Sequence, residues 1–275
     1  MSNDERPTPS PQSVADRFSG AAEQYAQSEQ RGGDDLAAVV AAVAAAPARE
    51  LVVDVATGPG STALALAAVA GRVVGTDLSP GMVAKGTERA AEAGITNATF
   101  EVADAEHLPF ADGEVDVVTC RIAAHHFPDV PAWLREVARV LGPRGRLVLL
   151  DSEAPEDAGV AAFLERMEIR RDPTHVHAFT ASEWQDMIVA AGFVVTEVQH
   201  HPKPKAFEPW LERGGVDAEA EDEVRRWVRD APPAVVAALH IEHDADGAPV
   251  RFADEKVLVV ADRAQPGAAP GTMAR

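Results

Sequence analysis

Cysteine, aromatic residues and positive charge are all scarce in this chain of 275 residues. A single cysteine, Cys120, cannot form a disulfide within the chain, which is typical of a protein from a reducing compartment. The 25 basic residues are outnumbered by 44 acidic ones, and the resulting net charge of −19 repels phosphate backbones and anionic membrane surfaces. We therefore expect a cytoplasmic protein with no nucleic-acid partner and no membrane partner.

Long hydrophobic runs are missing as well. The longest apolar stretch, residues 36–48, is rich in alanine, contains Pro47 and would span only about half of a bilayer. The first residues, MSNDERPTPSPQS, include no hydrophobic signal region, so we expect no export signal. Hydrophobic residues still make up 46% of the chain, which is enough to form a sizeable core.

Short apolar runs alternate with helical stretches from residue 51 onwards. Apolar runs that show little polar alternation predict strands covered on both faces, and their alternation with helices predicts a doubly wound α/β sheet. We expect a single domain over residues 14–263, with disordered, proline-rich ends at residues 1–13 and 264–275. The predicted strands are residues 51–56, 72–77, 98–104, 115–120, 145–151, 193–199 and 256–262.

Two segments interrupt this alternation. Residues 14–46 form a helical segment before the first strand, and residues 201–252 separate the last two strands. Connections of two to six residues are common in α/β domains, so the second segment is far too long to be a simple loop. We expect it to contain helices of its own and to cover a site.

A glycine turn follows the first predicted strand, in the sequence VVDVATGPGST. It contains Ala56, Gly58 and Gly60, and Asp54 comes just before it. Glycines at such a position let the backbone approach a ligand closely. The same letters also fit the dinucleotide pattern G-x-G-x-x-A, which is a weak signal by itself.

Carboxylates lie at the carboxyl ends of the first three predicted strands, and they belong to Asp54, Asp77 and Asp104. Ligands bind at this edge of an open parallel sheet. Asp77 is placed to accept hydrogen bonds from ribose hydroxyls, and Asp104 can accept one from an adenine amine. Asp54 would face the diphosphate of a nicotinamide dinucleotide at unfavourably short range. A cationic nucleoside without phosphate, such as S-adenosylmethionine, suits these three carboxylates better.

At this point the sequence resembles a family, the class I S-adenosylmethionine-dependent methyltransferases. The likeness is greatest to their ubiquinone/menaquinone C-methyltransferase branch, and it covers roughly residues 14–200. It implies a Rossmann-like sheet of seven mostly parallel strands with a reversed last strand, an N-terminal helical lid and a helical insertion before the last strand. The stretches that carry it are VVDVATGPGSTALALA, VVGTDLSPGMVAKG, FEVADAEHLPFADGEVDVVTC and LREVARVLGPRGRLVLLD.

The resemblance implies a role for each position in the first motif. Gly58 and Gly60 approach the methionine part of the cofactor, while Asp54 supports the turn and the ammonium group. Ala56 stands where the family pattern has its first glycine, which should narrow the turn only slightly. Asp77 binds the ribose.

The later motifs imply contacts with the adenine and the sulfonium. Leu78 and Met82 flank the adenine ring, although a methionine one turn into a helix is equally at home in a core. Asp104 and Ala105 read the edge of the adenine. Arg121 begins the segment that passes the sulfonium.

His125 and His126 are the candidate catalytic residues, because they follow the fourth predicted strand on the acceptor side of the sulfonium. Methylation of a hydroxyl or a carbon acid needs a base, and histidine has a suitable unperturbed pKa. One of the two could instead cap the next helix or only shape the methyl pocket. His175 and His177 form a pair that could bind a metal, but three or four ligands are required, and we expect no metal.

Candidate acceptor-side residues come from two segments. Arg170, Asp172 and His175 lie in a stretch that covers the substrate cavity in the resembling family, although a surface loop is the plainer interpretation of each. Phe18 and Tyr25 lie in the lid segment, where ordinary helix packing is the alternative.

The sequence as a whole predicts methyl transfer from S-adenosylmethionine to a hydroxyl or carbon of a small to mid-sized apolar metabolite. One alternative keeps the cofactor but catalyses another reaction, such as cyclisation or decarboxylation. A nicotinamide-dependent oxidoreductase is a further alternative. The sequence leaves open whether the protein is a monomer or a homodimer.

Overall fold

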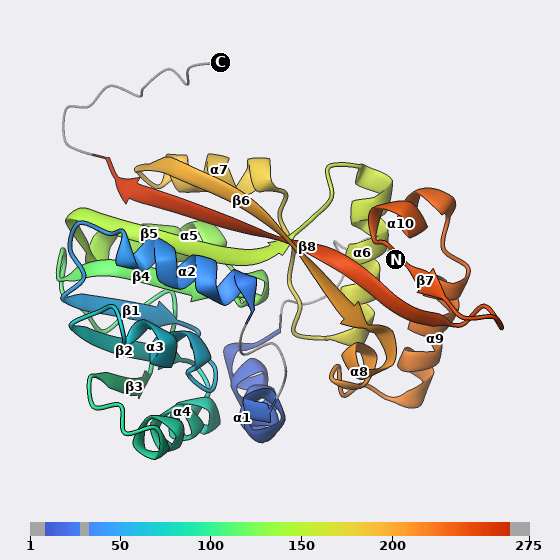
Figure 1. Cartoon of the computed structure of the whole chain (residues 1–275), viewed down its shortest axis with the longest axis horizontal. Helices are drawn as coiled ribbons and strands as arrows, with labels where there is room; N and C mark the ends of the chain where they lie inside the picture. The colour runs from blue at the N-terminus through green and yellow to red at the C-terminus, as the bar shows by residue number, and fades with distance from the viewer. Residues whose placement is uncertain (1–8, 28–32, 265–275) are drawn as a thin grey trace.

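A computed structural model describes residues 9–27 and 33–264 of the chain, and its centre is one twisted β-sheet (Figure 1). The main strands are β1 Leu51–Val55, β2 Arg72–Asp77, β3 Ala98–Val102, β4 Val115–Arg121, β5 Leu141–Glu153, β6 Phe193–Ala206 and β8 Pro249–Arg263. Their order is β3-β2-β1-β4-β5-β8-β6, and β8 runs in the opposite direction to the other six. The α/β class and the reversed last strand are therefore confirmed, and a two-residue strand, β7 Glu242–His243, adds an eighth member beside β8.

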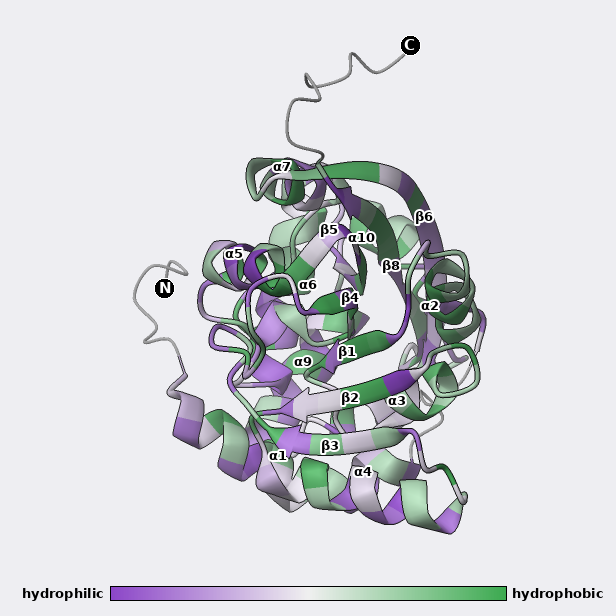
Figure 2. Cartoon of the chain, turned by 90° about the vertical axis from the view of Figure 1, so that its left-hand side faces the viewer, coloured by the Kyte–Doolittle hydropathy of each residue, from purple (hydrophilic) through white to green (hydrophobic). Residues whose placement is uncertain are grey.

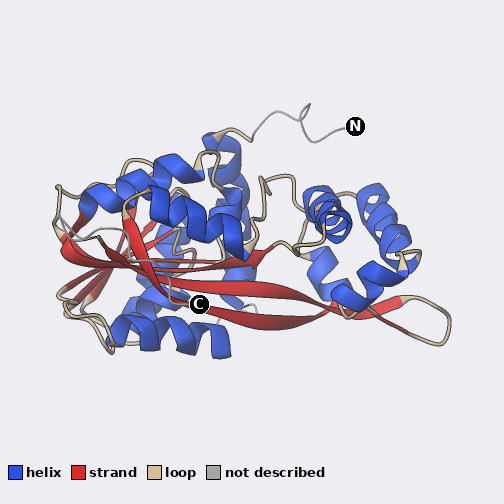
Figure 3. Cartoon of the chain, turned by 90° about the horizontal axis from the view of Figure 1, so that it is seen from above, coloured by secondary structure: helices blue, strands red, loops and turns tan. Residues whose placement is uncertain are grey.

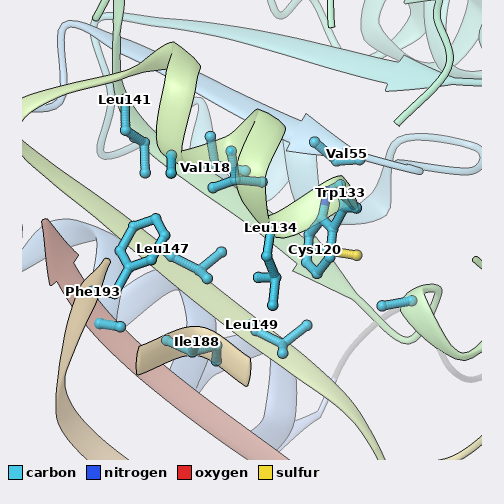
Figure 4. Close-up of a cluster of buried hydrophobic side chains, with 14 of the residues drawn as sticks. Val55, Val118, Cys120, Trp133, Leu134, Leu141, Leu147, Leu149, Ile188 and Phe193 are labelled. Carbon is cyan, nitrogen blue, oxygen red and sulfur yellow. The ribbon is translucent and has the colours of Figure 1, made fainter. Parts of the chain in front are cut away.

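Helices cover both faces of this sheet, as a doubly wound fold requires. On one face, α2 Asp34–Ala44 and α3 Ser61–Leu66 pack against apolar side chains of β1, β4, β5 and β8. On the other face, α5 Val130–Val140 and α7 Ala181–Ala190 bury Trp133, Leu134, Trp184 and Ile188 against the strands. Figure 4 shows Trp133, Leu134 and Ile188 in this cluster. Strands β1, β4 and β8 are correspondingly hydrophobic in Figure 2.

A helical lobe lies beyond one end of the sheet (Figure 3) and consists of four helices with the outer parts of β6 and β8. Its helices share a separate core that includes Phe163, Phe207, Trp210 and Phe252. The helices are α6 Ala158–Arg171, α8 Phe207–Glu212, α9 Ala218–Arg229 and α10 Pro233–Ala238.

The long connection before the last strand is shorter than expected, because β6 continues to Ala206 and β8 already begins at Pro249. The expected insertion of residues 201–252 therefore starts and ends as strand and is helical only in between. Pro202 and Pro204 are unusual within a strand, so the sequence did not predict this part of β6. They are tolerated because β6 is an edge strand, whose outer side needs no backbone N–H.

The N-terminal helix α1 Pro11–Gln27 begins inside the stretch that we expected to be disordered, residues 1–13. It lies against the start of α4 Pro80–Glu92, where the hydroxyls of Ser19 and Ser79 are 2.8 Å apart. Glu23 of α1 also pairs with Lys85 of α4. The expectations for residues 1–8 and 265–275 lie outside the described residues. Within the described ranges, no helix is both long and apolar enough to cross a membrane.

Phe100 of β3 fills a space that three glycines leave open. A β-carbon at Gly60, Gly75 or Gly86 would lie 2.6–2.7 Å from its ring. These glycines belong to the turn before α3, to β2 and to α4, so one aromatic ring packs against three elements of the nucleoside-binding edge. Gly60 also adopts a φ of 82°, which other residues rarely adopt.

We predict that Gly60→Ala destabilises the fold by more than the backbone conformation alone explains. The control is Gly94→Ala, because Gly94 has a φ of 66° but no atom within 4 Å of a β-carbon. The control should cost about 1 kcal/mol, and Gly60→Ala about 1–3 kcal/mol more because its β-carbon overlaps Phe100. Urea unfolding of both variants measures the difference, and equal losses of stability would show that Phe100 does not constrain this turn.

Candidate active site

A cavity of about 300 Å³ opens where the carboxyl ends of the parallel strands meet α1 and the helical lobe. We call its two parts the strand-end half, lined by the turns after β1 to β4, and the lobe half, lined by residues of α6, β6, α8 and β8. Most of the predicted site residues line this cavity: Phe18, Tyr25, Asp54, Ala56, Gly58, Asp77, Leu78, Met82, Asp104, Ala105, Arg121, His125, His126 and His175.

Asp54 lies at the bottom of the strand-end half with only 1% of its surface exposed. The hydroxyls of Thr57 and Thr119 donate hydrogen bonds of 2.5 and 2.6 Å to its two carboxylate oxygens. Burial nevertheless raises the pKa of Asp54 to about 6, because these hydroxyls and the charge of Arg121 only partly offset the loss of water. A ligand with a positive charge would stabilise the ionised form.

Asp77 connects the glycine turn to the start of α4. Its two carboxylate oxygens accept the backbone N–H groups of Gly58, at 2.8 Å, and of Ser79, at 2.9 Å. Burial raises its pKa, and these two backbone hydrogen bonds oppose the shift. Each oxygen keeps a second lone pair, so the carboxylate can still accept from the two hydroxyls of a ribose.

Backbone strain is concentrated at this edge of the sheet. Ala56 has a φ of 51° and Ile122 a φ of 56°, and both residues line the cavity. A left-handed backbone is a clear outlier for a β-branched residue such as Ile122, and strain of this kind gathers at functional sites. The substitution of alanine for the family's glycine at position 56 therefore carries a conformational cost, beyond the narrowing expected from its methyl group.

Arg121 at the end of β4 crosses from the strands to the helices above them. Its guanidinium donates to the hydroxyl of Thr62, at 2.9 Å, and to the carboxylate of Asp35 in α2, at 2.9 Å. Lys203 of β6 pairs with the same Asp35 oxygen at 2.8 Å. These contacts fix the guanidinium beside the cavity, where it can meet an anionic group of a ligand.

His125 forms a buried pair with Asp151. Its Nδ1 lies 2.5 Å from an oxygen of Asp151, which is fully buried at the end of β5. Burial raises the pKa of Asp151, but the His125 ring and the backbone N–H of Ser152 outweigh it and hold the pKa at about 2. An ionised Asp151 accepts the Nδ1–H of His125, so the lone pair of the ring is on Nε2.

His126 has a different environment from its neighbour. Its Nδ1–H donates to the backbone carbonyl of Thr174 at 3.0 Å, and its ring stacks edge-on against Phe18 with the centroids 5.2 Å apart. Burial and the adjacent His125 lower its pKa to about 3. The ring is therefore neutral at physiological pH and a weak base, although it does line the cavity.

His175 and two aromatic residues of α1 also line the cavity. The Nε2 atom of His175 is 2.9 Å from Glu165, and its ring is 5.5 Å from that of His125. Tyr25 of α1 is buried, and burial together with Asp172 raises its pKa. Its ring meets Phe18 edge-on at 5.7 Å.

Two predicted residues do not line the cavity. Arg170 points to α9, where its guanidinium pairs with Glu223, and Arg171, one position further along α6, reaches the cavity instead. Successive helical residues point about 100° apart. The family resemblance applied to the whole segment, so it could not distinguish Arg170 from Arg171. Gly60 packs against Phe100 and supports the turn from behind.

Sequence reasoning missed several residues of the cavity and its surroundings. Asp151 carried a usable signal, because it ends a predicted strand just as Asp54, Asp77 and Asp104 do. The lobe half offered no local signal, since its residues meet only through pairing of distant strands. The missed residues there are Ser152, Glu168, Arg171, Lys205, Arg213 and Lys256. Within the described residues, no group of three or more His, Cys, Asp and Glu side chains could hold a metal.

Comparison with known proteins identifies the family. Residues 53–149 match the family model described as a methyltransferase domain. The chain is 35% identical over 227 residues to the uncharacterized methyltransferase YcgJ of Bacillus subtilis, with 82% of this chain and 89% of that protein covered. The chain belongs to the S-adenosylmethionine-dependent methyltransferases.

Two further comparisons with this methyltransferase are informative. The crystal structure of YcgJ superposes with a TM-score of 0.79 at 33% identity, covering 84% of this chain and 98% of that one. The ubiquinone/menaquinone biosynthesis C-methyltransferase UbiE of Nitrobacter hamburgensis is 30% identical over 168 residues, which is 59% of this chain and 64% of that protein. The resemblance stated from the sequence is thus confirmed, and S-adenosylmethionine is the cofactor.

The strand-end half fits that cofactor. A β-carbon at Gly58 would meet nothing within 4 Å, so the backbone there is open to the cavity. Around this opening lie the carboxylates of Asp54 and Asp77 and the apolar side chains of Leu78 and Met82, and the described residues that line it include no phosphate-binding cluster of cations.

We predict that Asp54 makes the stability of the apo enzyme depend on pH. Because folding raises its pKa from 3.8 to about 6, its stabilising contribution is complete below pH 3.8 and disappears as the pH rises through 6. Relative to Asp54→Asn, the wild-type protein should lose about 3 kcal/mol of unfolding free energy over this window. Urea unfolding from pH 3.5 to 7.5 measures it, and parallel curves for the two proteins would contradict the prediction.

Proposed function

We propose that this methyltransferase methylates a hydroxyl or a carbon acid of a small to mid-sized metabolite, with His125 as the general base. The observation that carries the proposal is the His125–Asp151 pair on the wall of the cavity. An amine acceptor already has a free lone pair and would not need such a pair. The relative named as a C-methyltransferase supports a carbon acceptor as one of the two options.

The strand-end half is proposed to hold the cofactor. Asp77 accepts from the ribose hydroxyls, Asp104 and the backbone of Ala105 meet the adenine edge, and Asp54 faces the ammonium group. Arg121 is available for the carboxylate of the methionine part. When bound, S-adenosylmethionine supplies a methyl group whose bond electrons stay with sulfur, so that an oxygen or carbon acceptor must lose one proton.

His125 is suited to remove the proton because hydrogen bonds fix the orientation of its partner, Asp151. Asp151 accepts the N–H groups of Ala123, His125 and Ser152 as well as the ring Nδ1–H, so its carboxylate has a fixed orientation. It stabilises the imidazolium formed when Nε2 takes the proton. His126, with its low pKa, shapes the pocket beside the transferred methyl group.

The acceptor reaches this base through a cavity enclosed by α1, where Val14, Ala15 and Phe18 supply an apolar wall. Exclusion of water by this wall protects the transfer from hydrolysis.

A cytoplasmic location is also part of the proposal. It rests on the single cysteine, Cys120, which is free and buried.

We predict that Asp77→Asn weakens binding of S-adenosylhomocysteine, the demethylated cofactor, by about 10- to 100-fold. The loss corresponds to one or two hydrogen bonds to a charged group. Asp112→Asn is the control, because Asp112 is exposed and pairs with Arg139 away from the cavity. Isothermal calorimetry at pH 7.5 gives the dissociation constants. Unchanged affinity in the Asp77 variant would remove this residue from the ribose site.

We also predict that His125→Gln lowers kcat by about 10²- to 10⁴-fold, the range typical of a lost general base. His126→Gln should retain most of the turnover, because the ring of His126 is already neutral and weakly basic in the wild-type enzyme. Transfer of labelled methyl groups to a panel of phenols, alcohols and 1,3-dicarbonyl compounds measures turnover, and S-adenosylhomocysteine affinity checks that the cofactor site is intact. Equal turnover in the two variants would refute the assignment of the base.

A further inference from the structure

Two buried lysines share one carboxylate oxygen in the lobe half of the cavity. Lys205 of β6 and Lys256 of β8 both donate to Oδ2 of Asp254, at 2.5 and 2.8 Å. Lys256 also donates to the hydroxyl of Ser152 at 2.8 Å. Among the residues that the structure describes, Lys205 makes this single hydrogen bond, although its ammonium group has three N–H donors. Both lysines line the cavity, whereas Asp254 lies behind them.

Two further cations beside this part of the cavity are paired with carboxylates. Arg171 pairs with Glu168 at 3.1 Å, and Arg17 of α1 pairs with Asp172 at 3.4 Å. Asp151 and Glu165 lie nearby and are hydrogen-bonded to histidine rings. Lys205, Lys256 and Asp254 place two buried ammonium groups against one carboxylate, in a chain whose net charge is −19.

Trp210 of α8 supplies an independent observation. Its ring lines the same part of the cavity, it is only 2% exposed, and its indole N–H has no acceptor within residues 9–27 and 33–264. A buried donor without a partner costs about 1–3 kcal/mol. The guanidinium of Arg171 lies 4.7 Å from the centre of the Trp210 ring, so a positive charge and an unused donor are side by side.

We propose that the lobe half binds a carboxylate group of the methyl acceptor, held by Lys205, Arg171 and the indole N–H of Trp210. The acceptor is then an amphipathic acid, whose apolar body lies along Val14, Ala15 and Phe18 and whose nucleophilic atom reaches His125. This inference rests on the proposed function, and it adds a carboxylate to the small to mid-sized apolar metabolite that the sequence predicted.

The ionisation of Lys205 agrees with this assignment. Burial and the charge of Lys256 lower its pKa to about 8, against the opposing effects of Asp254 and Glu168. A carboxylate beside the ammonium group restores the charged form. Binding of an anion near pH 8 therefore takes up protons, which calorimetry in buffers of different ionisation enthalpy detects.

The test compares octanoate with octanamide, a neutral molecule of nearly the same shape, on enzyme saturated with S-adenosylhomocysteine. We expect octanoate to bind about ten-fold or more tightly than octanamide, with proton uptake at pH 8. Lys205→Met should abolish both the preference and the proton uptake. Lys205→Arg keeps the charge and should retain the preference, and Trp210→Phe should reduce it.

The matched control is Arg229→Met, which removes an exposed positive charge from the same lobe and should leave the preference unchanged. Equal affinities for the two probes, or no binding of octanoate at millimolar concentration, would overturn the proposal. Tighter binding of octyl phosphate than of octanoate would overturn it in favour of a phosphate. Failure to bind S-adenosylhomocysteine is a separate result, which would refute the proposed function itself.

Discussion

Buried carboxylates at the carboxyl edge of the sheet hold the site together. Asp77 accepts backbone N–H groups from two different turns, Asp54 joins the first turn to β4, and Asp151 joins the segment after β4 to β5. A buried carboxylate is stable only if its oxygens are satisfied, so each of these residues requires the neighbouring turn to take one conformation. The shape of the strand-end half follows from this requirement, and the strained φ angles of Ala56 and Ile122 are the local cost of meeting it.

The strand-end half was predictable because its signals are local in sequence. A strand, a carboxylate at its end and a glycine turn occupy a dozen residues, and the parallel sheet brings successive strand ends to one edge. The lobe half had no such signal. Lys205 and Asp254 meet only because β6 and β8 pair over their full length, and two prolines concealed the outer part of β6. Arg170 illustrates a finer limit. It lies on α6 next to Arg171, but Arg171 reaches the cavity whereas Arg170 faces α9.

The overall charge and the local charge of this enzyme act on different ligands. The acidic surface repels polyanions over the range of the Debye length, about 8–10 Å, whereas the buried cations act on groups that have already left water. Inside the cavity the two halves differ, with Asp54 and Asp77 beside the glycine turn and Lys205, Lys256 and Arg171 in the lobe half. An acceptor with a carboxylate, as proposed above, would enter in one orientation only.

Helix α1 is the element that touches both halves. Ser19 and Glu23 meet α4 beside the nucleoside edge, while Arg17 meets Asp172 and the backbone of Gly214 at the edge of the lobe. These three side chains lie within two turns of one helix, which is too short and stiff to leave one half while staying on the other. A movement of α1 as one body would therefore open both halves of the cavity together, and a handful of polar contacts on this single helix oppose it.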